Sequence, residues 1–162
     1  MRVSENALKW AMRLYPPLFF QRIWVIKFEK GFRGVKVKIN KSFINNNYNN
    51  SIFGGTIFAA ADPFYPILFH QALTHRGCKV RVWVKSAQIE YILAGRKDLY
   101  FTVSLDDSMI EDVEQTLNKG EKYIKTHPIE MHDSDGELCV TMQCEIYIRN
   151  LESTETKAAV TI

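Results

Sequence analysis

The apolar segment from residue 54 to 77 constrains the fold more than any other part of the sequence. Apolar residues recur along it at helical spacing and occupy more than one face of the helix that this spacing predicts. The segment ends at His75-Arg76-Gly77, which is typical of a helix C-terminus. A helix that is apolar on several faces has to be covered on most sides. We therefore expect residues 55–76 to form a central helix that the rest of the chain wraps.

The remaining sequence supplies mainly β-strands, which are indicated by alternating apolar and polar residues. Two strands precede the central helix and four or more follow it, with a hairpin turn at Ser134-Asp135-Gly136. The expected strands cover residues 24–28, 35–39, 80–85, 88–93, 99–105, 121–132 and 137–149, and shorter helices cover residues 4–15 and 108–120. Ser4 and Ser108 are the expected N-caps of these shorter helices. The predicted fold class is α+β, an antiparallel sheet of about six strands around a long central helix.

The composition is that of an ordinary globular protein. The chain has 162 residues, of which 46% are apolar and 24% charged, with a formal net charge of +3. These values exclude the disordered, collagenous and disulfide-framework classes. The small positive excess is spread along the chain and does not indicate nucleic-acid binding. We expect one domain over residues 1–150 and a flexible tail over residues 151–162.

The sequence predicts neither a cofactor nor a metal site. It contains no P-loop, GxSxG, HExxH or CxxC motif. Its three cysteines, Cys78, Cys139 and Cys144, have no zinc-ligand spacing and are interpreted as reduced structural thiols. Lys9 and Arg13 interrupt the N-terminal apolar residues, so no secretory signal is expected. The longest apolar stretch is too short and too broken for a membrane span, and we expect a cytoplasmic protein.

Gly54 and Gly55 open the central helix. The first N–H groups of a helix have no internal acceptor, and the helix dipole makes that end electropositive. Glycine there lets a ligand approach the backbone closely, so the pair could polarise a carbonyl and stabilise an oxyanion. The alternative is a structural role, in which the two glycines only allow a tight entry into the helix.

Asp62 is the only charged residue between Phe53 and His70. Burial raises the pKa of a carboxyl group and makes it a better base near neutral pH, so Asp62 is a candidate base or nucleophile. The alternative is that Asp62 caps a helix that restarts at Pro63. Asn47, in the asparagine-rich loop before the helix, is a candidate to orient water, and its alternative is loop bonding.

The spacing of these candidates predicts a dimer. Gly55 and Asp62 are seven residues apart, which is about 10 Å along a helix, so one carbonyl cannot touch both groups of one chain. Two antiparallel central helices would bring Gly55 of one chain near Asp62 of the other. Arg76, Lys79, Arg81 and Lys85 are candidates to hold the phosphates of a ligand, and the alternative places them on a solvated strand face.

The sequence from Asn47 to Pro63, N-Y-N-N-S-I-F-G-G-T-I-F-A-A-A-D-P, resembles the hot-dog fold family. It is most similar to the branch labelled DUF4442, which is related to the phenylacetic-acid-type thioesterases. Those enzymes have an Asn before a His-Gly-Gly and an Asp or Glu further along the central helix. Asn47, Gly54, Gly55 and Asp62 match these positions, with Asn46 and Asn49 as neighbouring alternatives to Asn47, whereas Phe53 replaces the His.

The resemblance implies a hot-dog fold and an acyl-CoA or acyl-carrier thioesterase. It implies a homodimer, with a tetramer left open, no bound nucleic acid, and catalytic roles for Asp62, Gly55, Gly54 and Asn47. The substrate would lie near Phe53, Phe58, Arg81 and Lys85. A second hypothesis is a hot-dog dimer that binds acyl thioesters without cleaving them. A dehydratase is a third, less favoured hypothesis, since those enzymes pair the carboxylate with a nearby His.

Overall fold

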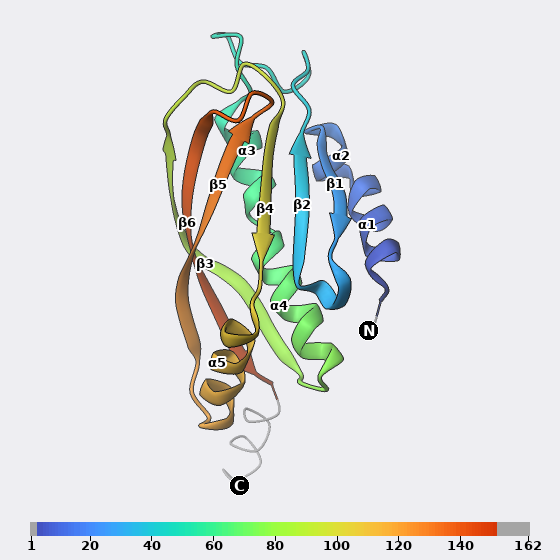
Figure 1. The fold of residues 1–162 in the computed structure, drawn as a ribbon, viewed down its shortest axis with the longest axis vertical. Helices are drawn as coiled ribbons and strands as arrows, with labels where there is room; N and C mark the ends of the chain where they lie inside the picture. The colour runs from blue at the N-terminus through green and yellow to red at the C-terminus, as the bar shows by residue number, and fades with distance from the viewer. Residues whose placement is uncertain (1–2, 152–162) are drawn as a thin grey trace, which may run out of the picture.

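A computed structural model describes residues 3–151, and the tail expected over residues 151–162 lies outside this range except for Leu151. The chain forms a curved antiparallel sheet with the central helices against one face, as Figure 1 shows. The helices are α1 (Glu5–Leu14), α2 (Pro16–Phe20), α3 (Gly54–Ala61), α4 (Phe64–His75) and α5 (Asp107–Asn118). The strands are β1 (Ile23–Phe28), β2 (Gly34–Ile39), β3 (Val80–Tyr91), β4 (Leu99–Ser104), β5 (Tyr123–Asp133) and β6 (Leu138–Asn150).

The sheet has the order β1-β2-β4-β5-β6-β3, and every neighbouring pair is antiparallel. β1 and β2 form one hairpin, and β5 and β6 form the expected second one, which turns at Gly136, whose φ is +88°. The predicted strands 80–85 and 88–93 are one strand, β3. A register shift between Val84 and Ser86 interrupts its alternation, so the two halves looked separate in the sequence.

The predicted central helix is present but divided at Asp62 and Pro63, between α3 and α4. Both residues keep right-handed helical backbone angles, so α4 continues the direction of α3 (Figure 1). Pro63 and Pro66 have no N–H, so the carbonyls of Ala59 and Asp62 lose the hydrogen bonds that a regular helix would give them.

The wrapping of this helix is confirmed by burial on several of its faces. Phe64, Leu68, Phe69 and Leu73 on α4 have no accessible surface, and they lie within the continuous hydrophobic core that the strands supply. Among the polar groups of α4, the Tyr65 hydroxyl donates to a carbonyl of β5 at 2.8 Å.

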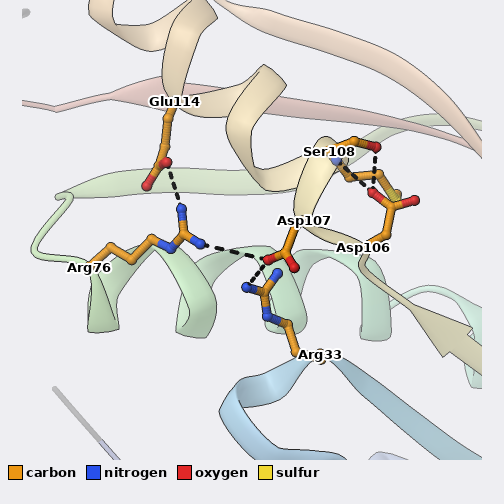
Figure 2. A network of polar contacts seen from close by, with 7 residues as sticks. Arg33, Arg76, Asp106, Asp107, Ser108 and Glu114 are labelled. Atoms are coloured by element: carbon orange, nitrogen blue, oxygen red, sulfur yellow. Dashed lines mark hydrogen bonds and ion pairs between the residues drawn. The ribbon is translucent and has the colours of Figure 1, made fainter.

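Helix α1 begins at the expected cap, because Ser4 accepts a hydrogen bond from the Ala7 N–H. The predicted cap of α5 is wrong. Asp106 accepts from the Met109 N–H at 2.7 Å, and the Ser108 hydroxyl itself donates to Asp106 at 2.6 Å (Figure 2). An ionised carboxylate is the stronger acceptor at the positive end of a helix, which explains why Asp106 takes this position.

Ion pairs tie α5 to Arg33, just before β2, and to Arg76, just after α4. Asp107 pairs with Arg33, and Arg76 bonds Glu114 at 2.7 Å while lying 4.0 Å from Asp107 (Figure 2). Arg76, a candidate for phosphate binding in the sequence, is therefore held in a network that joins three elements.

Candidate active site

The start of α3 presents free backbone donors. Phe53 precedes the helix with extended backbone angles, and its carbonyl accepts from the N–H groups of Thr56 and Ile57. Within residues 3–151 we find no acceptor for the N–H groups of Gly54 and Gly55. These two donors lie at the electropositive end of the helix, where a developing oxyanion is stabilised.

An aromatic side chain lies close to each of the two glycines. A Cβ on Gly54 would lie 3.0 Å from the Tyr91 hydroxyl oxygen, which donates to the Gly54 carbonyl at 3.0 Å. A Cβ on Gly55 would lie 2.4 Å from the Phe53 ring, which covers this residue. Tyr91, at the end of β3, thus fixes the start of α3. Sequence reasoning missed it because nothing in the alternation of β3 distinguishes Tyr91 from its neighbours.

The asparagine-rich loop is held by two of its own side chains. Asn45 is buried, and its amide satisfies four hydrogen bonds with Gln21, Asn40 and Ser42. The Asn47 Oδ1 accepts from the N–H of Asn49 at 2.9 Å and from the N–H and the hydroxyl of Ser51, both at 3.1 Å. The loop-bonding interpretation therefore holds for the Asn47 oxygen.

Asn47 nevertheless lies beside the start of α3. It lines a cavity of about 340 Å³ together with Gly54, Ile57 and Tyr91. Asn46 and Asn49, the neighbouring alternatives, do not line this cavity. Because the Asn47 oxygen is occupied, only its amide N–H₂ group can bind a ligand there.

Asp62 lies at the break between α3 and α4 and is exposed in the single chain. Within residues 3–151 its carboxylate has neither a hydrogen bond nor an ion pair. The N-cap interpretation is wrong, since Pro63 occupies the cap position and α4 has no side-chain cap. Partial burial among apolar groups raises the pKa of Asp62 above its ordinary value.

Asp62 lines a second cavity, of about 470 Å³, between the N-terminal helices and the central helices. Phe58, a predicted substrate contact, lines the same cavity. Gly54 and Asn47 line the first cavity and not this one, so one chain does not bring the predicted catalytic residues together. This separation agrees with the distance argument from the sequence.

The predicted phosphate-binding cations lie away from both cavities. Arg81 and Lys85 are exposed on β3, and Lys85 pairs with Glu145 at 2.8 Å. The solvated-face interpretation of these side chains agrees with this placement.

The described residues contain no cluster of His, Cys, Asp and Glu that could hold a metal ion. Cys139 and Cys144 are buried and free of disulfide bonds, and burial raises the pKa of Cys144 to about 11. No helix in the described part of the chain has the length and apolar character needed to cross a membrane.

Comparison with known proteins identifies the fold. The model of the family described as "domain of unknown function (DUF4442)" matches residues 5–148. No curated protein gives a significant match. A Pseudomonas aeruginosa protein described as a probable thioesterase has a TM-score of 0.82 at 16% identity, with 93% of this chain and 98% of that chain covered.

Two further solved structures share the fold. A Haemophilus influenzae thioesterase has a TM-score of 0.67 at 11% identity, with 93% of this chain and 94% of that chain covered. A Streptococcus mutans protein bound to acetyl CoA has a TM-score of 0.56 at 15% identity, with coverages of 81% and 91%. The sheet and central helices are those of the hot-dog fold, as the sequence resemblance implied.

Proposed function

The chain belongs to the DUF4442 family, and on this premise we propose that it hydrolyses an acyl thioester of CoA or an acyl carrier at a site built by two copies of the chain. The observation that carries the proposal is the unpaired carboxylate of Asp62, seven residues from the free N–H of Gly55 and eight from that of Gly54. Partial desolvation raises the pKa of this carboxyl, which favours it as a base near neutral pH.

The free edge of the sheet offers a way to join two copies. β3 pairs with β6 along one side only, which leaves the other side of a 12-residue strand open among the described strands. Pairing of β3 with β3 of a second copy would cover this edge and place the central helices antiparallel. Asp62 of one chain would then face Gly54 and Gly55 of the other.

The reaction follows from these groups. The thioester carbonyl accepts hydrogen bonds from the Gly54 and Gly55 N–H groups, and Asp62 of the other chain takes a proton from water. The water oxygen attacks the carbonyl carbon, and the tetrahedral intermediate collapses as the C–S bond breaks. The leaving thiolate receives the proton from Asp62. The Asn47 N–H₂ group helps to orient the water.

The test is thiol release from a panel of acyl-CoAs with a thiol-reactive dye. Asn is nearly isosteric with Asp but cannot take the proton, so Asp62→Asn should lower the rate by roughly 10²–10⁴-fold. The control is Asp112→Asn, on α5 and outside both cavities, which should leave the rate unchanged. Equal turnover by wild type and Asp62→Asn would refute the catalytic assignment.

The second candidate function is a dimer that binds acyl thioesters without cleaving them. It is favoured by one observation, the Phe53 ring over Gly55 in place of the imidazole of the related enzymes. Saturable binding of acyl-CoA without thiol release, in wild type at every chain length, would support it over hydrolysis.

A further inference from the structure

The cavity beside Asp62 is lined mostly by apolar side chains, which indicates the part of a substrate that it could bind. Its side chains come from α1, α2, α3 and α4 and the ends of these helices. Beside Asp62, the polar side chains in the lining are Tyr15 and Gln21, and the Gln21 amide already donates to the Pro17 carbonyl at 3.0 Å. The rest of the lining is apolar: Met12, Leu18, Phe58, Ala59 and Ile67 with two prolines.

The exposure of the lining residues gives the cavity a direction. Asp62 and Tyr15 are exposed, whereas Met12 and Leu18 are only 6% and 4% exposed. Phe58 and Pro17 are exposed as well, so the mouth carries both the carboxylate and apolar groups, and the buried end of the cavity is formed by Met12 and Leu18. A ligand that places its reacting carbonyl at Asp62 would extend its other end between α1–α2 and α3–α4.

We propose that this cavity binds the acyl chain of the substrate, and that α1 and α2 select aliphatic chains without charged substituents. The inference rests on the proposed function, because it takes Asp62 as the group next to the thioester. The apolar end has no cation to pair with a carboxylate on the chain, and Asp62 repels such a group at the mouth.

The volume limits the chain length. The cavity of about 470 Å³ has room for several methylene groups, and its finite size limits the chain length that it accepts. Each methylene that moves from water into an apolar environment should raise affinity or kcat/KM about fourfold, until the cavity is full.

The test fills the cavity from α3. Ala59 lines the cavity and is partly buried, so Ala59→Phe places a ring where the chain would lie. Displacement of two or three methylenes should lower kcat/KM for octanoyl-CoA and longer substrates by roughly 15- to 60-fold. Turnover of acetyl-CoA should change by less than about twofold. Ala11→Phe, at an exposed position on α1 outside the cavity, is the matched control and should keep the wild-type profile.

Parallel binding measurements separate this inference from the proposed function. S-alkyl-CoA thioethers, which cannot be hydrolysed, are titrated by calorimetry into wild type, Ala59→Phe and the smaller Ala59→Leu. Chain-length-dependent binding that Ala59→Phe removes supports the cavity assignment even if no thioester is cleaved. An unchanged chain-length dependence in both folded Ala59 variants overturns it, whatever the hydrolysis assay gives. Tight binding of a dicarboxylic acyl chain would also overturn it.

Discussion

A dimer of two different variant chains, here called a mixed dimer, gives a quantitative test of the proposed two-chain site. One chain carries Asp62→Asn and keeps its glycines, and the other carries Gly55→Val and keeps its carboxylate. In this trans arrangement one site combines the intact Gly55 of the first chain with the intact Asp62 of the second, and the other site has both defects. Two-fold symmetry therefore leaves one working site of two, and the activity should be about half that of wild type.

The magnitude follows from the geometry. Gly55 and Asp62 of one chain are about 10 Å apart along the helix, and the neighbouring Gly54 lines a different cavity from Asp62, so the proposed site needs two chains. A Cβ at position 55 would lie 2.4 Å from the Phe53 ring, so valine forces the ring to move and covers the free N–H. Gly55 lies within α3, so the substitution keeps a backbone conformation that valine can adopt.

The assay uses co-expressed chains with two different affinity tags, purified over both tags, and thiol release as the readout. The matched control is the cis arrangement, in which one chain carries both substitutions and the other is wild type. In the cis dimer each site has one defect, so the activity should fall to the background of the single-variant homodimers. Half activity in cis and background in trans would show that each chain completes its own site and would refute the two-chain geometry.

Three further predictions concern single residues. The rate should fall at acidic pH with an apparent pKa above that of an ordinary Asp, because Asp62 must be ionised to accept a proton; the acidic limb should be absent in Asp62→Asn. Tyr65→Phe removes the 2.8 Å hydrogen bond from the Tyr65 hydroxyl to the Pro128 carbonyl and should lower the free energy of unfolding in urea by about 0.5–1.5 kcal/mol. Leu68→Ala should lower it by about 2–5 kcal/mol, whereas Leu14→Ala, 67% exposed, should have little effect.

Asp62 also links pH to stability. Its pKa is raised in the folded chain, so the folded state holds this proton more tightly than the unfolded state does. Its ionisation therefore lowers stability as pH rises from the unfolded pKa through the folded one. Asp62→Asn should accordingly raise the melting temperature above that interval and have no such effect below it, which thermal unfolding at several pH values can measure.

Periodicity in the sequence predicts the fold where it reports burial directly. The several apolar faces of residues 55–76 predict a wrapped helix, because such a surface has no other stable placement. Periodicity does not report local interruptions of hydrogen bonding. The division at Pro63 depends on missing N–H groups, and the continuity of β3 past Val84 depends on a bulge that shifts the alternation.

The candidate site likewise contains residues that the sequence identifies and residues that only the structure reveals. Asp62 and the glycines stand out in the sequence because a charge and two small residues are unusual in an apolar helix. The sequence alone could not decide whether Asp62 is a helix N-cap. In the structure it is not, because Pro63 takes the cap position. Nothing in the sequence indicates the contact of Tyr91 with Gly54 or the part of the cavity lining that comes from α1 and α2, since both depend on which elements meet in space.

Phe53 limits which groups near Gly54 and Gly55 can donate or accept a proton. Its ring covers Gly55 and carries no hydrogen-bonding atom, so at this position the chain cannot supply the donor or base that an imidazole provides. The Asn47 oxygen is also occupied, by three loop hydrogen bonds. The other polar groups beside Gly54 are two backbone N–H groups, one amide N–H₂ and the Tyr91 hydroxyl, whose proton is donated to the Gly54 carbonyl. None of them is a carboxylate or an imidazole, so the proposed reaction assigns the proton from water to Asp62 of the other chain. Hydrolysis at the wild-type rate without that carboxylate would contradict this proposal.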